Sequence, residues 1–488
     1  MDALVQTVED VAGASGGESE NEGDGEDEDV RDGGDGGGVA AGGNEEAEEE
    51  TGMEIEYDVY DVSNEAIAAR RRKHAHEEAT SPGWTQHDKH VFILSSAGKP
   101  IYARYGDESR LSGFFGVLQA MISFVDDNDD ELQHLVAGDV TYVFYSNGPL
   151  YYVCVARTRE PASHLRMLLQ YVHNLVVSVL TAPYIVRLFE QRPHFDLRRM
   201  LGGTEPLIDS LIELMDSDPS YLLGAAECLR LAASVRAAVG SALQEVKISG
   251  LLYALVIADS HLVTLVRPKS RGLHPIDLLL IMNFVKASPT LRNEAADSWT
   301  PFCLPHFNDT GHLHVYSSFL ASGVCLLLIS TEAESFHDMQ ACKDRVATEI
   351  TAGGHLAAIT DAMASQAYSV DELGIPGLLH FLYKSVSSRQ YTAPAWSAPY
   401  ITGGEQRRLL RVYQDVIEKV HTVANDVKIY YQVSQSETLL AWVTSSFELY
   451  VVFGPLVPKK LAIASCNKLL RWIKSQEGTL FILNSPVW

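Results

Sequence analysis

Three times along this 488-residue chain, paired apolar runs are followed by an amphipathic helical segment, and this repeated order constrains the fold most strongly. The clearest pair of runs is VTYVFY and LYYVCVA, which flank Ser146, Asn147, Gly148 and Pro149. An Asn-Gly step between two alternating apolar runs is typical of a tight β-hairpin. The first repeat reads as two strands, a helix, three strands and a second helix, and the later repeats follow a similar order.

The expected elements fall into three blocks. In the first block we expect strands at 91–96, 101–105, 132–137, 140–145 and 150–156, with helices at 111–125 and 164–181. In the second we expect strands at 251–259, 262–268, 312–320 and 323–331, with helices at 275–288 and 336–350. In the third we expect strands at 378–385, 390–396, 428–433, 438–445 and 447–454, with helices at 405–423 and 459–475. Mixed blocks of this kind predict an α/β (α+β) protein of several domains.

The acidity of the chain is concentrated at its N-terminal end. Residues 1–60 contain 21 acidic side chains and one basic side chain, whereas the formal net charge of the whole chain is −26. Segments rich in Gly, Glu and Asp bury too little apolar surface to offset their conformational entropy, so residues 1–85 are expected to be a disordered acidic tail. Within this tail RRRK, at 70–73, is expected to be a solvated charge run, with a nuclear-import signal as the alternative. The lack of a large basic field argues against nucleic-acid binding.

The stretch SSAGKP, at 95–100, invites comparison with a phosphate-binding loop. A Walker loop needs a Gly five residues before its Gly-Lys pair and a Ser or Thr after it, and a helix must follow. Here Ile93 occupies the first position, Pro100 occupies the last, and a strand follows. The stretch is therefore interpreted as a turn between two strands.

Metal-binding and covalent chemistry find little support. Cys303, His306, His312 and His314 lie within twelve residues, but their spacing differs from the paired spacing of zinc sites, so zinc remains a weak alternative to a loop that enters a strand. No convincing catalytic, cofactor-binding or metal-ligating set emerges. The six scattered cysteines suit a reducing compartment, and neither a secretory signal nor a membrane-spanning run is expected.

The helix expected at 111–125 has two contrasting sides. Phe114, Phe115, Leu118, Ile122 and Val125 suit its core side. The other side carries small residues at helical spacing, which allow another backbone to approach closely: Ser112, Gly116, Ala120 and Ser123. Together with Gln119 we interpret them as a candidate partner interface. A helix that exposes small residues to solvent is an equally open interpretation.

Three long segments are similar to one known family. FILSSAGKPIYARYG, LQHLVAGDVTYVFYSNGPLYYVCVARTRE and WTPFCLPHFNDTGHLHVYSSF resemble the SAND-type vacuolar fusion proteins, the Mon subunit of the Mon–Ccz complex. The resemblance runs from about residue 89 onward. It implies three longin domains, each a five-stranded antiparallel sheet with flanking helices. The expected organisation is a tail (1–85), a first longin domain (86–203), a helical connector (204–245), a second longin domain (246–355) and a third (356–488).

The resemblance also implies a function. Such a protein, with a Ccz-type longin partner subunit, is a guanine nucleotide exchange factor for the late-endosomal Rab GTPase, and it drives endosome maturation and vacuole or lysosome fusion. It acts by binding and needs no cofactor. The small-residue side of the helix at 111–125 would belong to the GTPase platform. The alternative is a longin-type adaptor or tethering scaffold without exchange activity.

The expected location follows from the same resemblance. It is the cytosol and the cytosolic face of the late endosome, prevacuolar compartment and vacuole, with peripheral contact to a phosphoinositide-containing membrane. The helix at 459–475, which carries five basic residues, is the nearest candidate for lipid contact, although it is expected to pack on the third sheet.

Overall fold

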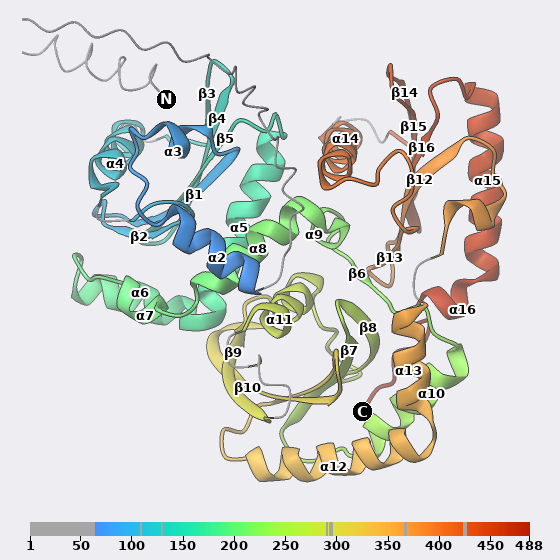
Figure 1. Ribbon diagram of the computed structural model, residues 1–488. Coiled ribbons are helices and arrows are strands. Elements are labelled where there is room, and N and C mark those ends of the chain that lie inside the picture. The colour runs from blue at the N-terminus through green and yellow to red at the C-terminus, as the bar shows by residue number, and fades with distance from the viewer. Residues whose placement is uncertain are drawn as a thin grey trace, which may run out of the picture. The chain divides into compact units, whose positions relative to one another are not determined.

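The computed structural model describes residues 64–107, 110–127, 130–288, 291, 296–365, 368–422 and 427–488. These residues form three β-sheets with helices on both faces of each sheet (Figure 1). Most of the tail expected at 1–85, namely residues 1–63, lies outside the described residues.

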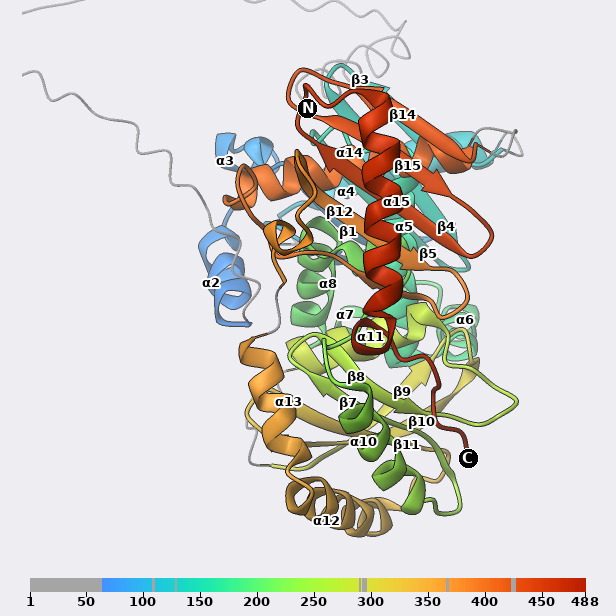
Figure 2. The same cartoon turned by 90° about the vertical axis from the view of Figure 1, so that its right-hand side faces the viewer.

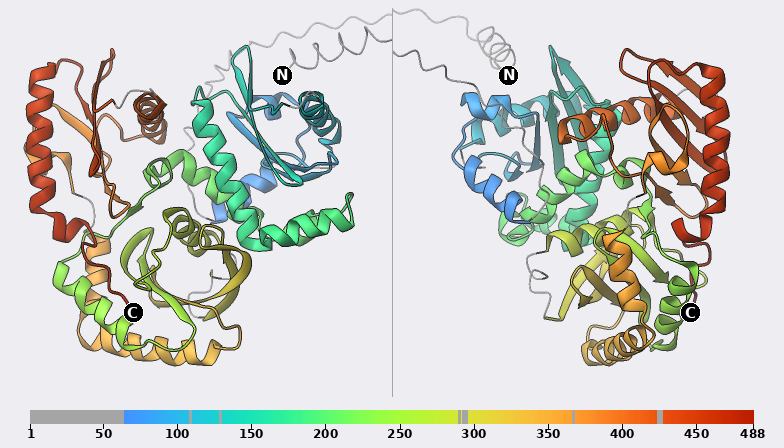
Figure 3. Two further views of the ribbon diagram at one scale, coloured as in Figure 1. Left: turned by 180° about the vertical axis from the view of Figure 1, so that it is seen from behind. Right: turned by 45° about the vertical axis from the view of Figure 1, so that its right-hand side comes forward.

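The first sheet has the strand order β2-β1-β5-β4-β3, with α4 on one face and α5 on the other (Figures 1 and 3). Alternation along β1 explains the two covered faces. Val91 and Ile93 join the core that contains α5, whereas the Phe92 ring lies 5.5 Å from the Phe115 ring of α4. The elements are β1 (Lys89–Ser95), β2 (Pro100–Ala103), α4 (Ser112–Asp126), β3 (His134–Ala137), β4 (Val140–Asn147), β5 (Leu150–Ala156) and α5 (Ala162–Leu180).

The second sheet has the strand order β8-β7-β11-β10-β9. Helix α11 packs against one face of this sheet, and α10 (Ala233–Glu245), α12 and α13 pack against the other. The sequence predicted a loop before residue 312, but the chain there forms a hairpin of β9 and β10. The elements are β7 (Leu251–Ala258), β8 (His261–Val266), α11 (Pro275–Ala287), β9 (Ser298–Leu304), β10 (Asn308–Ala321), β11 (Val324–Ser330), α12 (Phe336–Ala352) and α13 (His355–Ala364).

The third sheet has six strands, in the order β14-β15-β16-β12-β13-β6, where five were expected. The sixth strand, β6 (Ala226–Glu227), comes from the connector and pairs in parallel with β13. Helix α14 covers one face and α15 lies along the other, where Figure 2 shows it crossing the strands. The elements are β12 (Leu378–Ser385), β13 (Gln390–Thr392), α14 (Gly403–Thr422), β14 (Ile429–Val433), β15 (Thr438–Val443), β16 (Phe447–Phe453), α15 (Lys459–Ser475) and α16 (Glu477–Leu480).

The connector between the first two domains is mostly helical, and its helix α8 is central to the packing. Helix α8 contacts α2, α5, α11 and α14, which belong to different parts of the chain. Its apolar residues lie in one continuous core that extends from the first sheet to the second. Helices α6 (Ala182–Gln191) and α7 (Arg198–Leu201) follow α5 and precede the connector, whose helices are α8 (Glu205–Ser217), α9 (Pro219–Leu223) and α10 (Ala233–Glu245).

The expectation of disorder through residue 85 is wrong for the residues that the structure describes. Two helices precede the first sheet: α2 (Asn64–His74) and α3 (Pro82–Gln86). Trp84 of α3 is fully buried, and its indole Nε1 donates a hydrogen bond of 3.2 Å to the Tyr105 carbonyl. The high polarity of this segment concealed its order, because its contacts are made by a few side chains only.

The segment after α16 returns to the second domain. The Trp488 indole donates a hydrogen bond of 2.8 Å to the Leu252 carbonyl, and Pro486 passes close to α10. A Cβ atom at Gly240 of α10 would lie 2.6 Å from Cγ of Pro486. Glycine is therefore required there by close approach.

Among the described residues, no single helix is long and apolar enough to cross a bilayer; α5 and α6 meet the criterion only together, as a pair bent by 81°.

Two helical glycines make a matched pair for a stability test. At Gly116 of α4 an added Cβ would meet no atom within 4 Å, whereas at Gly240 it would meet Pro486. Alanine should stabilise the exposed position by about 1 kcal/mol through its higher helix propensity. We therefore expect Gly116→Ala to raise the midpoint of thermal unfolding and Gly240→Ala to lower it. A rise for both variants would show that the Pro486 segment does not pack against α10.

Candidate partner-binding surface

The outward side of α4 is the surface that the sequence proposed for a partner. The inward side is formed by Phe115, Leu118 and Ile122, which are buried against the first sheet. Ser112, Gly116 and Ala120 are exposed at successive i, i+4 positions. This exposed ridge of Ser112, Gly116 and Ala120, hereafter the α4 ridge, has no bulky side chain of its own.

The other two predicted residues, Gln119 and Ser123, are half-buried and are engaged within the domain. The Gln119 amide donates hydrogen bonds of 3.1 Å to the Ser96 carbonyl and to the Ser123 hydroxyl. Gln119 thus ties α4 to the turn between β1 and β2. Binding of a partner by all five predicted residues stays a prediction, and the geometry favours the α4 ridge for direct contact.

The SSAGKP stretch is the turn that the sequence indicated. Strands β1 and β2 pair antiparallel on either side of it, and the Gly98 N–H donates to the Ser95 carbonyl at 2.8 Å. Gly98 has a φ of +73°, a left-handed conformation that favours glycine. A Cβ atom there would also lie 3.1 Å from Cγ of Gln119. The Lys99 ammonium donates to the His194 carbonyl at 2.5 Å, so it serves an intramolecular contact.

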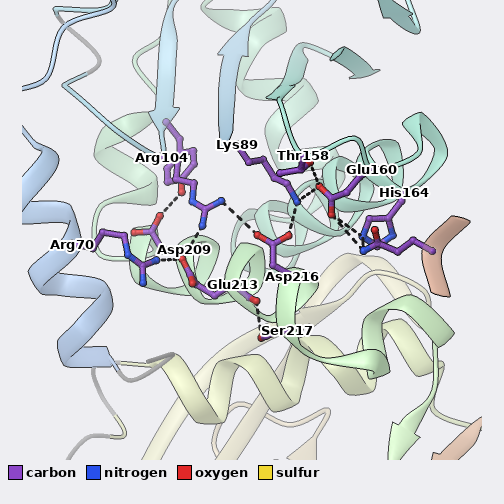
Figure 4. Close-up of polar contacts among 12 residues, drawn as sticks. Arg70, Lys89, Arg104, Thr158, Glu160, His164, Asp209, Glu213, Asp216 and Ser217 are labelled. Carbon is purple, nitrogen blue, oxygen red and sulfur yellow. Dashed lines mark hydrogen bonds and ion pairs between the residues drawn. The ribbon is translucent and has the colours of Figure 1, made fainter. Parts of the chain in front are cut away.

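A buried ionic cluster joins the first domain to α8 (Figure 4). Asp209, Glu213 and Asp216 follow one another at spacings of four and three residues, which places them on one side of α8. Glu213 accepts a hydrogen bond of 2.8 Å from Arg104, which follows β2, and Tyr102 of β2 donates to Asp209. Buried charges need such partners, because removal from water is costly.

Lys89 of β1 lies between two carboxylates of this cluster, Asp216 of α8 and Glu160 (Figure 4). Its ammonium group lies 2.5 Å from a carboxylate oxygen of Asp216 and 2.6 Å from one of Glu160. Burial by itself would lower the pKa of Lys89, but these two carboxylates raise it above its ordinary value. Gln414 of α14 extends the cluster to the third domain, since its amide lies 2.9 Å from Nε2 of His164 and 3.4 Å from Oε1 of Glu160.

The basic run at 70–73 is not simply a solvated charge run. Arg70 of α2 pairs with Glu213, and Arg71 pairs with Asp209 at 3.0 Å. Burial raises the pKa of Asp209, and the guanidinium of Arg71 counteracts this effect. The two arginines therefore hold α2 against α8. Sequence reasoning missed the cluster, although Lys89 at the start of an apolar strand and three carboxylates on one side of α8 were its visible signals.

The histidines near Cys303 do not converge on a metal. The Cys303 thiol donates to the Asn308 carbonyl at 3.1 Å, and His306 faces Asp277 at 3.4 Å. His312 bonds the Val179 carbonyl at 3.0 Å, whereas His314 stacks on Trp299. These four side chains therefore have separate partners in the part of the chain that the structure describes, and the structure gives the zinc alternative no geometric support.

Comparison with known proteins agrees with this architecture. Family models described as the first, second and third Longin domains of FUZ, MON1 and HPS1 match residues 89–211, 249–348 and 377–477. The "Vacuolar fusion protein MON1 homolog A" of Bos taurus is 42% identical over 409 residues, which cover 83% of this chain and 73% of the relative. The chain belongs to the MON1/SAND family. The resemblance found in the sequence and the expected longin fold are both confirmed.

Two more relatives show how widely this MON1/SAND similarity extends. "Protein SAND" of Takifugu rubripes is 42% identical over 410 residues, covering 84% of this chain and 78% of the relative. "Vacuolar fusion protein MON1" of Cryptococcus neoformans is 35% identical over 404 residues, covering 81% and 65%. The first family model extends through residue 211 and so includes much of α8.

Removal of one carboxylate from the ionic cluster should destabilise the protein strongly. Glu213→Ala would remove the carboxylate that lies 2.8 Å from the buried guanidinium of Arg104, and removing one member of a buried ion pair typically costs about 3–5 kcal/mol. Glu190→Ala on α6 removes an exposed carboxylate and should change the stability by about 0.5 kcal/mol or less. Urea denaturation followed by circular dichroism compares the two, and equal midpoints would contradict a structural role for the cluster.

The cluster also predicts an acid dependence of stability. Burial by itself would raise the pKa of Glu160, but the charge of Lys89 and further contacts lower it from 4.5 to about 2. The unfolded chain therefore takes up the proton first, so stability is lost as the pH falls from about 4.5 towards 2. Glu160→Gln should show a shallower loss in denaturation measured across this range. An unchanged slope would contradict the assignment.

Proposed function

We propose that this chain is a subunit of a heteromeric guanine nucleotide exchange factor that activates the late-endosomal Rab GTPase in vacuolar fusion. The observation that carries the proposal is membership of the MON1/SAND family across all three longin domains, together with the vacuolar fusion names of the relatives. The partner is a Ccz-type longin subunit. The chain acts by binding, without covalent chemistry.

The α4 ridge supports a role in close backbone contact. Its residues, Ser112, Gly116 and Ala120, present little side-chain volume, and at Gly116 an added Cβ would meet no atom within 4 Å. The ridge is carried by a helix that is fixed to the sheet by buried aromatic and aliphatic side chains and to a turn by Gln119. A rigid helix with small outward residues suits docking of a GTPase or of the partner subunit, because little side-chain entropy is lost there.

Exchange by binding has a clear energetic requirement. A nucleotide held with nanomolar affinity represents about 12 kcal/mol of binding free energy. The exchange complex offsets this energy by binding the nucleotide-free GTPase more tightly than the loaded form, which weakens nucleotide binding by the same coupling free energy. A surface that discriminates between two GTPase conformations is sufficient, so a site without an acid, base or nucleophile is compatible with the activity.

Peripheral membrane contact is part of the proposal. Leu456 is 94% exposed in the loop before α15, and Lys459 and Lys460 follow it at the start of that helix. An exposed apolar side chain beside basic residues suits an anionic lipid surface rich in phosphoinositides. The buried face of α15, formed by residues such as Ala462, Cys466 and Leu469, packs on the third sheet as expected. The proposed location is the cytosolic face of late endosomes, the prevacuolar compartment and the vacuole.

Release of a fluorescent nucleotide from the late-endosomal Rab tests the proposal. We expect the chain together with its Ccz-type partner to accelerate release on phosphoinositide-containing vesicles, and Gly116→Trp to reduce the rate at least tenfold, because its indole would project from the α4 ridge. Ala357→Trp on α13 is the matched control, since Ala357 is also an exposed small helical residue.

Two results would contradict parts of this proposal. Failure of the wild-type pair to accelerate release, with the partner still bound, would favour an adaptor or tethering scaffold. An equal rate for Gly116→Trp and Ala357→Trp would remove the α4 ridge from the exchange surface but leave the activity in place.

A further inference from the structure

Three potential metal ligands meet where the N-terminal helices join the first longin domain. His74 is the last residue of α2, Glu77 follows in the turn, and His87 lies between α3 and β1. The position of His74 is further fixed by its carbonyl, which accepts a hydrogen bond of 3.2 Å from the Gly106 N–H. The three side chains therefore come from two stretches of backbone, one at the end of α2 and one between α3 and β1.

The geometry of the three ligand atoms is compact. Nδ1 of His74 lies 2.6 Å from Oε1 of Glu77, and Nε2 of His87 lies 2.7 Å from Oε2 of the same carboxylate. One ligand atom from each of the three residues can be chosen so that all lie within 4.8 Å of one another, and all three residues are half-buried. Among the residues that the structure describes, this is the one group of three or more His, Cys, Asp or Glu side chains that meets this criterion.

This donor set matches the preference of zinc. Zinc binds imidazole nitrogen at about 2.0–2.1 Å and carboxylate oxygen at about 2.0–2.2 Å in tetrahedral geometry, so neighbouring ligand atoms lie about 3.3 Å apart. The present separations are shorter by roughly 0.6 Å, a gap that a small rotation of the Glu77 carboxylate could open. Two histidines and one glutamate leave the fourth position to water.

The surrounding aromatic side chains hold the ligands in place. The Tyr105 ring stacks on the His87 ring at 3.7 Å with an interplanar angle of 7° and meets the His74 ring edge-on at 5.5 Å.

We propose that His74, Glu77 and His87 form a zinc site that fastens α2 and α3 to the first longin domain. Zinc takes the place of the two imidazole protons that otherwise bond Glu77, and each ring stays neutral because its proton moves, by way of solvent, to the other ring nitrogen. The site lies outside the proposed GTPase surface on α4. Zinc at this site would fix the end of α2, and α2 also carries Arg70 and Arg71, which pair with carboxylates of α8.

The competing explanation is a metal-free triad in which each neutral imidazole donates a hydrogen bond to Glu77. Titration of the full-length, chelator-dialysed chain with Zn²⁺ in a calorimeter separates the two. We expect one tight equivalent of zinc, and affinity at least tenfold weaker in His87→Ala and in Glu77→Gln. His76→Ala and Glu78→Gln are matched controls, because both residues are exposed neighbours in the same segment, and they should bind zinc as the wild type does.

Hydrogen exchange gives a second readout. Zinc should slow amide exchange across residues 64–87 in the wild type and in His76→Ala but not in Glu77→Gln, which also decides the matter if His87→Ala fails to fold. Equal zinc affinity in the wild type and Glu77→Gln, absence of a tight equivalent, or unchanged exchange on zinc addition would each overturn the proposal in favour of the hydrogen-bonded triad.

Discussion

The rest of the structure depends on how the carboxylates of α8 are satisfied. Asp209, Glu213 and Asp216 lie on one side of a helix that packs among four other helices, where an unpaired charge would cost several kcal/mol. Asp209 contacts Arg71 and Tyr102. Glu213 contacts Arg70 and Arg104, and Asp216 contacts Lys89. These partners come from α2 and from β1 and the end of β2, so α8 satisfies its charges only when the N-terminal helix and the first sheet are both in place.

Apolar packing and the ionic cluster have different consequences. One continuous apolar core joins the first and second sheets through α5, α8 and α11, and it supplies most of the favourable free energy, because that scales with buried apolar area. The ionic cluster contributes little net energy by comparison but defines the register of α8, since a shift by one residue would leave Glu213 without Arg104. Gln414 of α14 connects the cluster to the third domain through its contact with His164.

Much of the secondary structure could be predicted, because hydrophobic alternation and helical periodicity are local signals, whereas the longin architecture was implied by the resemblance to the SAND-type family. Of the five core residues predicted on α4, Phe115, Leu118 and Ile122 are buried, whereas Phe114 and Val125 are half-buried. Contacts between distant segments could not be predicted. Strand β6 has two residues, and it is a strand only because β13 pairs with it. Likewise the sequence of α2 is typical of a polar tail, because the carboxylates of α8 that pair with Arg70 and Arg71 are distant in the sequence. The contact of His74 and His87 with the same Glu77 also could not be predicted, because the two histidines lie thirteen positions apart in the sequence.

Strand β6 also makes the third domain discontinuous in sequence. Ala226 and Glu227 complete the edge of the third sheet, yet they precede the whole second domain in the chain. The third longin domain, taken as a continuous stretch of sequence, therefore lacks one strand of its own sheet. A fragment cut before β12 would expose the outer edge of β13, and an exposed edge strand favours pairing with other chains. Dissection of the protein into single longin domains thus exposes the edge of β13 that β6 covers in the intact chain.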